Sequence, residues 1–201
     1  MINATSKKIA DFLAEKAGYD QGEDRYQSML FFIKAILHNV MKMLILLAAA
    51  LWISVKVSAL FFAYMIFLMC IYGMIKRFSF GVHSANEALC TVAGLIYYLG
   101  GTFLAMEVEM HFLIVLLVMG VCFMLNWKYS PAPTQKRKIG EKEGKKLKGY
   151  VLFVYGDVFL LAIVFILAGQ TIFLNLILLA VAWQSITVLP ITYRLLGERR
   201  E

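Results

Sequence analysis

The chain has 201 residues, of which 61% are hydrophobic, and its formal net charge is +7. A soluble domain averages about 45–50% apolar residues, so this excess excludes an ordinary soluble protein with one buried core. The apolar residues come in long runs, and about 20 of them cross a bilayer as a helix. Eight of the 20 lysine and arginine residues lie in one segment between such runs, which indicates membrane orientation and argues against a nucleic-acid partner.

The first residues of the chain are polar and charged, so we expect no cleavable signal peptide. Over residues 3–17 the spacing of Ile9, Phe12 and Leu13 predicts an amphipathic helix. Such a helix either lies in the headgroup plane of a membrane or packs on the rest of the protein, and the sequence leaves both open. Residues 18–25 form a polar break, and residues 1–28 are interpreted as an N-terminal cytoplasmic segment.

Six apolar segments follow this break, and each is long enough for a transmembrane helix. Lys34, His38 and Lys42 recur every fourth residue and line one face at the start of the first segment. The sequence therefore predicts an all-α integral membrane protein, a single domain over residues 1–201 with about six transmembrane helices. The expected spans are 36–55, 57–75, 88–105, 110–126, 150–168 and 171–190.

Lysine and arginine are distributed unevenly among the connecting segments. Residues 76–87 hold two, the loop expected at 127–149 holds eight and the tail from residue 194 holds three, whereas residues 106–110 and 169–171 hold none. With six spans the three basic segments fall on one side, and the positive-inside rule makes that side the cytoplasm. We therefore expect both termini in the cytoplasm.

His83 and Cys90, at the cytoplasmic end of the third span, are the first candidates for chemistry. A continuous helix would place them on one face but about 10 Å apart along its axis. A Cys–His pair works at about 3 Å, so the chain must turn between them. Ser84 or Asn86 can cap a helix that starts there, and Cys90 would then lie near its positive end, which favours a thiolate. Taken alone, this spacing more often belongs to two residues without a catalytic role.

The other cysteines, Cys70 and Cys122, lie in apolar runs with no histidine nearby, and we interpret them as small hydrophobic residues. The three cysteines are odd in number and show no metal-binding spacing, so we predict neither a disulfide framework nor a metal site or cofactor.

The loop expected at 127–149 contains a Pro131-Ala132-Pro133 turn and then the basic cluster Lys136, Arg137 and Lys138. One interpretation is a solvated connector that fixes the topology. The other is a site that holds an acidic peptide or anionic headgroups. The residues themselves do not decide between the two.

Two stretches together resemble the accessory gene regulator B (AgrB) family, bacterial membrane peptidases of quorum sensing. The stretch KRFSFGVHSANEALC resembles the family's basic-aromatic-glycine-histidine motif with its catalytic cysteine, and YSPAPT with the following lysine–arginine cluster resembles its Pro-Ala-Pro-Thr loop. The length and the helix layout are similar over nearly the whole chain. Many members carry two glycines before the histidine, whereas this chain has Gly81 and Val82, and a typical proline after the basic cluster is missing.

The resemblance implies a cysteine endopeptidase of the bacterial cytoplasmic membrane whose active site faces the cytoplasm. His83 would activate Cys90, which would remove the C-terminal tail of an AgrD-type propeptide through a thioester and promote closure of a thiolactone or lactone ring. It also implies a homodimer. Candidate substrate-binding residues are Lys76, Arg77, Lys136, Arg137 and Lys138, and the group that orients His83 is left open among Asn86, Glu87, Asp157 and Gln184.

A small membrane transporter or sensor without covalent chemistry is the alternative from a different class. Asp157, Asn175 and Gln184 are polar residues within the last two spans and would line its path. The plainer interpretation is that they form hydrogen bonds between helices, and the two halves of the chain lack the repeat symmetry that many transporters show.

Overall fold

The computed structural model describes residues 2–18, 24–82, 87–132 and 140–196, and within these ranges the secondary structure is helical apart from one isolated β-bridge. Six of the helices are long and apolar enough to cross a membrane. The predicted all-α multi-pass membrane protein is therefore confirmed. The chain divides into two compact units, Met1–Trp52 and Ile53–Glu201.

In the first unit, helix α1 (Ile2–Ala17) packs on the beginning of helix α2 (Asp24–Lys56). Their contact is made by the small residues Ala10 and Ala14 against Tyr26, whose hydroxyl donates a hydrogen bond of 2.6 Å to Asp11 Oδ1. The large apolar residues Ile9, Phe12 and Leu13 of the predicted amphipathic face are exposed instead. Helix α1 thus packs on the protein with its small residues and keeps an apolar face available for a headgroup layer.

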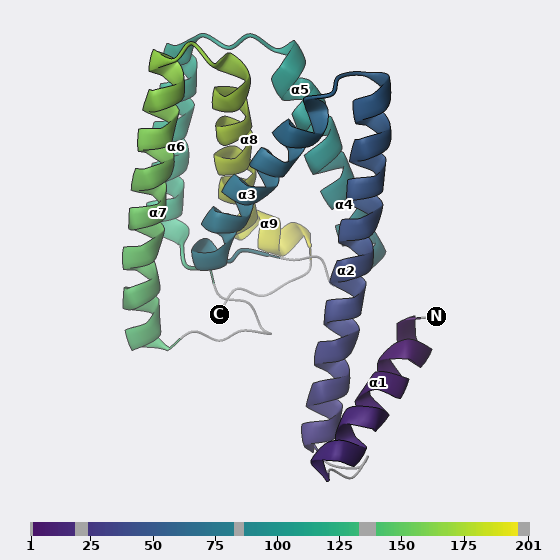
Figure 1. Ribbon diagram of the computed structural model, residues 1–201. Helices are drawn as coiled ribbons and strands as arrows, with labels where there is room; N and C mark the ends of the chain where they lie inside the picture. Colours follow the sequence, from purple (N-terminus) through teal and green to yellow (C-terminus); the bar gives the residue numbers. More distant parts are fainter. Residues whose placement is uncertain (1, 19–23, 83–86, 133–139, 197–201) are drawn as a thin grey trace. The chain divides into compact units, whose positions relative to one another are not determined.

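The second unit is built around α8, the most buried of the six spans. Helix α8 contacts α3, α5, α6, α7 and α9 (Figure 1). Its residues are apolar on almost every side, as expected for a helix that other helices surround. The helices of this unit are α3 (Phe61–Ser79), α4 (Glu87–Leu95), η1 (Ile96–Gly100), α5 (Gly101–Glu107), α6 (Phe112–Tyr129), α7 (Glu141–Leu167), α8 (Thr171–Val188) and α9 (Pro190–Leu195).

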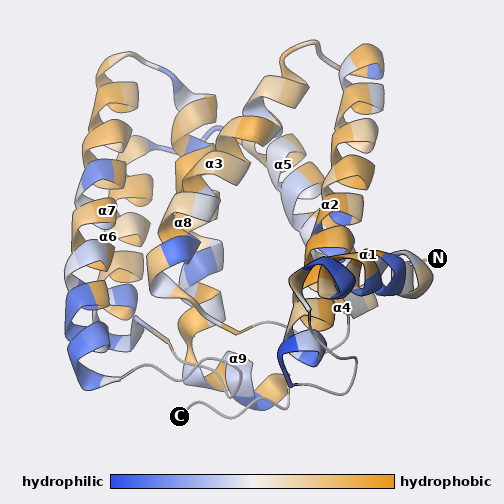
Figure 2. Ribbon diagram, turned by 60° about the horizontal axis from the view of Figure 1, so that its bottom comes forward, coloured by the Kyte–Doolittle hydropathy of each residue, from blue (hydrophilic) through white to orange (hydrophobic). Residues whose placement is uncertain are grey.

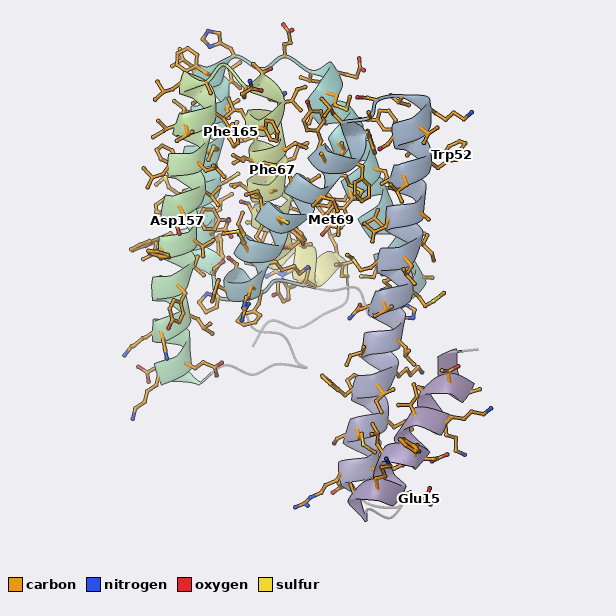
Figure 3. All side chains as sticks on the ribbon, in the orientation of Figure 1. Glu15, Trp52, Phe67, Met69, Asp157 and Phe165 are labelled. Carbon is orange, nitrogen blue, oxygen red and sulfur yellow. The ribbon has the colours of Figure 1, made fainter. Side chains whose placement is uncertain are left out.

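Aromatic side chains fix α3 against α7 and α8. Phe67 of α3 makes edge-to-face contacts with Phe165 and Phe173, at centroid distances of 5.7 and 5.0 Å, and the latter two rings are stacked at 4.8 Å. Phe67 and Phe165 lie in the same part of the unit (Figure 3). Aromatic pairs of this geometry add stability beyond the area that they bury, so they hold the register of the three helices.

The helix boundaries differ most from the sequence-based spans at three places. Helix α2 begins at Asp24, 12 residues before the expected span 36–55, so part of the segment interpreted as N-terminal to the spans belongs to the same helix. Helix α3 begins at Phe61 rather than at residue 57 and continues to Ser79, because Lys76 and Arg77 lie in its last turn, where cations are favourable at the negative end of a helix. Helix α7 begins at Glu141, so the basic loop predicted at 127–149 is limited to residues 130–140.

The early start of α7 follows from local electrostatics. Glu141 and Glu143 lie in its first turn, where acidic residues are favourable, and Lys145 Nζ lies 2.8 Å from Glu141 Oε1 one turn away. A polar composition was therefore compatible with a helix that extends beyond the apolar span.

The described parts of the basic segments that charge counting assigned to one side lie at the same end of the second unit. Phe78, at the end of α3, contacts Tyr150 of α7 at a centroid distance of 5.4 Å. Hydrophilic residues gather on the first turns of α7 (Figure 2). The assignment of this end, and of both termini, to the cytoplasm stays a prediction.

Candidate active site

The segment that leads to His83 is held in place by hydrogen bonds to its backbone. Phe80 N donates to Lys76 O at 3.0 Å and ends α3, and Val82 N donates to Thr187 O of α8 at 2.9 Å. Gly81, between them, has φ +108°, and a Cβ built on it would lie 2.7 Å from Thr187 Oγ1. A residue with a side chain would therefore both strain the backbone and collide with α8.

Residues 130–132, at the start of the Pro-Ala-Pro stretch, meet this segment. Ala132 N donates to Ser79 O at 3.0 Å, and Phe80 and Ala132 form an isolated parallel β-bridge. Tyr193 of α9 closes the contact from the other side, because its buried hydroxyl donates to Ala132 O at 3.1 Å. Val82, Ala132, Val188 and Tyr193 form a small buried core around this junction.

We call this arrangement the clamp, comprising residues 79–82, 130–132, 184–188 and Tyr193. It joins two stretches that the sequence analysis singled out separately. In the sequence, His83 comes directly after residues 79–82 of the clamp. The basic cluster at 136–138 comes shortly after residues 130–132 of the clamp. The clamp thus fixes the points from which both segments leave the helices.

Two buried amide side chains hold the ends of α3 and α6 against α8 within the clamp. Gln184 is fully buried, and its Nε2 donates to Phe80 O at 2.7 Å. Asn126, also fully buried, donates from Nδ2 to Ser185 Oγ at 2.7 Å, and its Oδ1 accepts from Ser130 Oγ at 3.3 Å. Polar groups buried at this depth are costly unless bonded, so these contacts specify where α6 and α3 end against α8.

Cys90 lies in the first turn of α4, which begins at Glu87. Among the described residues the third span thus begins three residues before Cys90, close to the expected start at residue 88, and the turn predicted between His83 and Cys90 lies outside the described residues. The side chain of Cys90 is half-buried, and it interacts electrostatically with Lys76 of α3. A helix N-terminus and a nearby cation both favour the thiolate over the thiol.

Tyrosines surround this pair of residues. Tyr72 and Tyr98 lie near Cys90, and Lys76 Nζ donates to the Tyr72 hydroxyl at 3.0 Å. The rings of Tyr72 and Tyr98 each contact Tyr97, at 5.2 and 4.9 Å. Tyr97 and Tyr98 lie in the π-helical turn η1, two turns beyond Cys90, and such turns often occur at functional sites.

The remaining candidate residues are divided between described and undescribed parts of the chain. Arg77 is exposed, with its guanidinium 5.9 Å from the centre of the Phe78 ring, so it does not share the partly buried position of Lys76. His83, Asn86 and the cluster Lys136, Arg137 and Lys138 lie outside the described residues, and of Glu87 only the backbone is described.

The polar residues of the last two spans do not line a common path. Asn175 Nδ2 donates to Ala105 O at 3.1 Å and Val108 O at 2.6 Å, and Gln184 bonds to Phe80 O as described. Asp157 is exposed on α7 (Figure 3). The interpretation that Asn175 and Gln184 form hydrogen bonds between elements is confirmed, and Asp157 lies apart from both.

The cysteines differ clearly in environment: Cys70 is exposed, Cys122 is buried and Cys90 is intermediate, and each carries a free thiol. Among the residues that the structure describes, no group of three histidine, cysteine or acidic side chains could hold a metal ion.

Sequence reasoning missed the residues that complete the site. Tyr72 is four residues before Lys76 and Tyr97 is seven after Cys90, so helical spacing was a signal available for both. Thr187 and Tyr193 gave no comparable signal, because they meet Gly81 and Ala132 only through the tertiary fold.

Comparison with known proteins identifies the family of the chain. The family profile described as Accessory gene regulator B matches residues 6–188. An AgrB-like protein of Listeria monocytogenes serovar 1/2a is 26% identical over 195 residues, which are 96% of this chain and 91% of the relative. An AgrB-like protein of Clostridium acetobutylicum is 29% identical over 135 residues, 67% of this chain and 63% of the relative.

Accessory gene regulator protein B of Staphylococcus epidermidis is 25% identical over 122 residues, 61% of each chain. No solved structure matches this chain. The family profile covers nearly the whole sequence, so the match includes the six transmembrane helices and every residue of the clamp except Tyr193. The chain therefore belongs to the accessory gene regulator B family and takes part in the accessory gene regulator quorum-sensing system as a multi-pass membrane protein.

Proposed function

We propose that this protein is a membrane-bound cysteine endopeptidase that removes the C-terminal tail of an AgrD-type propeptide and promotes cyclisation of the signal segment. The position of Cys90 carries this proposal. It lies in the first turn of a helix, half-buried beside Lys76, whereas Cys70 and Cys122 have neither feature. Family membership supplies the substrate class.

In the first step, the His83 imidazole takes the proton from the Cys90 thiol, and the thiolate attacks the carbonyl carbon of the peptide bond before the tail. The tetrahedral intermediate collapses when its C–N bond breaks. The leaving amine receives the proton from His83, so the tail departs with a free N-terminus. The leader and signal segment stay on Cys90 as a thioester.

In the second step, a thiol or hydroxyl within the signal segment attacks the thioester carbonyl. His83 takes the proton of this nucleophile and returns it to the Cys90 sulfur as that sulfur leaves. The product is a thiolactone or lactone, and the enzyme is regenerated without consuming water. Exclusion of water from the thioester is needed for this outcome, and the buried Tyr72, which lies near Cys90 and packs on the buried Tyr97, supports it.

Supporting roles follow from position. Lys76 stabilises the thiolate, since it is the cation that interacts with Cys90. Gln184 acts as a positioning residue, because it bonds to Phe80 O three residues before His83. Arg77 and the cluster Lys136, Arg137 and Lys138 attract the acidic tail by charge, and this role rests on sequence alone.

The site faces the cytoplasm of a bacterial cell in this proposal, and the protein acts as a homodimer. The sidedness is supported by the basic end of the second unit, where the Lys76 turn and the start of α7 lie together. A cytoplasmic site is also the side on which a newly made propeptide is available.

The test uses purified protein in lipid with a synthetic propeptide encoded beside its gene. Mass spectrometry measures release of the tail by the unmodified protein and by the variants Cys90→Ala, His83→Ala and Cys70→Ala. We expect release by the unmodified protein and by Cys70→Ala, and none by the other two. Release that persists in Cys90→Ala would refute the mechanism. If the folded, unmodified protein releases no tail, the result would favour a transporter or sensor over a peptidase.

A further inference from the structure

We propose that the groove between α6 and α7 at the basic end of the second unit binds an anionic phospholipid. A cavity of about 750 Å³ opens there, lined by Phe123, Met124, Leu125, Trp127, Lys128 and Lys148. This volume is within the range of small-molecule sites, about 300–1,000 Å³. The groove lies outside the clamp and the Cys90 environment, so the proposal does not depend on the peptidase activity.

The lysines provide the headgroup contact. Lys148 is half-buried, with its Nζ 5.4 Å from the centre of the Trp127 ring, and Lys128 is exposed, with its Nζ 5.3 Å from the centre of the Tyr129 ring. Among the described residues neither lysine forms a salt bridge. Two ammonium groups at one groove without a carboxylate partner favour a phosphate.

The rest of the groove is apolar and continues into the membrane span. Phe123, Met124 and Trp127 are all exposed, Met124 at 71%, although α6 is one of the six transmembrane helices. Lys128 lies in the last turn of α6, so the cations are at the end of the span and the apolar residues are further inside it. The two lysines at the end of the span match an anionic lipid headgroup, and the apolar floor of the groove further inside the span matches its acyl chain.

This order of groups decides between a lipid and an acidic peptide. A peptide tail with several carboxylates is complementary to the lysines but not to exposed phenylalanine and methionine side chains at membrane depth. Free phosphate would use the lysines alone. A phospholipid uses both parts of the groove, and the tryptophan at their boundary is typical of a membrane interface.

The same helix offers a matched control. Lys145 and Lys146 lie three and two residues before Lys148 and are exposed, and neither lines the groove. Lys145 also forms the salt bridge with Glu141. The double variants Lys128→Gln/Lys148→Gln and Lys145→Gln/Lys146→Gln therefore remove equal charge from the same end of the molecule, and only the first removes it from the groove.

Native mass spectrometry of the purified full chain in detergent measures retained phosphatidylglycerol against phosphatidylcholine of the same acyl length. We expect the unmodified protein and the Lys145/Lys146 variant to retain phosphatidylglycerol, and the Lys128/Lys148 variant to retain at least about 5-fold less. Lys128→Arg/Lys148→Arg should restore retention, which separates loss of charge from a folding defect. Equal loss in both glutamine variants, or equal retention of the two lipids, would overturn the proposal.

Competition distinguishes the remaining ligands. Glycerol phosphate, which carries the headgroup charge without a chain, should not displace the lipid at millimolar concentration. Displacement by glycerol phosphate would contradict the role of the apolar floor and reduce the site to a phosphate site. Displacement by an acidic peptide at equimolar concentration would contradict the lipid assignment in favour of a peptide site.

Discussion

Two buried amides on α8 perform the same chemistry at opposite ends of the second unit. Asn175 donates to the backbone carbonyls of Ala105 and Val108 where α5 ends, and Gln184 donates to the carbonyl of Phe80 where α3 ends. Each leaves its own carbonyl oxygen without a hydrogen-bond partner among the described residues. The local interactions are therefore closely matched.

The chain segments held by the two amides differ. After Val108 comes a short acidic connection to α6, with Glu109 and no candidate for chemistry except the capping His111. After Phe80 come Gly81, Val82 and then His83. A buried amide on a central helix therefore affects activity only if the segment that it holds carries a catalytic residue. Stability and activity should respond differently at the two sites.

Gly81→Ala should have the strongest effect on the Gln184 end. The new Cβ would lie 2.7 Å from Thr187 Oγ1 at a backbone conformation that favours glycine, so the segment before His83 must move. Displacing a catalytic group by about 1 Å can cost about 10²-fold in rate, and we expect at least that loss in tail release. Gly73→Ala in α3, where nothing lies within 4 Å, is the control and should release the tail at the unmodified rate. Unimpaired release by Gly81→Ala would show that the clamp does not position the site.

Replacing the two amides compares the ends directly. Gln184→Ala and Asn175→Ala should both lower thermal stability, Asn175→Ala by more, since Asn175 makes two hydrogen bonds and Gln184 one, and each such bond contributes about 0.6 kcal/mol on average. Only Gln184→Ala should also lower kcat for tail release, by about 10-fold, because only it shifts the segment before His83. Stability is measured by thermal unfolding in detergent and release by mass spectrometry. An equal loss of kcat in both variants would reduce Gln184 to a purely structural residue.

The charge next to Cys90 should have a more modest effect. Lys76→Gln should slow alkylation of Cys90 by iodoacetamide about 5-fold at neutral pH, because a nearby cation favours the reactive thiolate. Arg77→Gln removes an adjacent but exposed charge and should leave the rate unchanged, whereas Lys76→Arg should largely preserve it. Both Cys70 and Cys122 are replaced by serine in this background so that one thiol is followed. A slower rate in Arg77→Gln as well would indicate a general surface-charge effect.

The number and order of the transmembrane helices could be predicted from the sequence, because lipid requires long apolar runs and these runs are visible in composition. The first turns of α7 could not, since Glu141 to Gly149 is polar and composition alone predicts a loop. The pair of Glu141 with Lys145 was the available signal for a helix there. The π-helical turn at Ile96–Gly100 has no counterpart in hydropathy.

The site was predictable in part for a related reason. The motif spacing singled out His83 and Cys90, and the helix start before Cys90 could be inferred from capping residues. The bridge between Phe80 and Ala132 joins residues far apart in the chain. The same is true of the hydrogen bond from Tyr193 to Ala132. Periodicity and local propensity contain no information on such contacts, so the clamp required the structure.

Acylation of Cys90 can be tested by trapping the thioester. A propeptide whose internal nucleophile is replaced by alanine can lose its tail but cannot close a ring. With this peptide we expect an adduct with the mass of the leader and signal segment to accumulate on Cys90 and to be released by hydroxylamine, as a thioester is. Release of the tail with no adduct, or an adduct on Cys70 or Cys122 instead, would refute the assignment of Cys90 as the nucleophile.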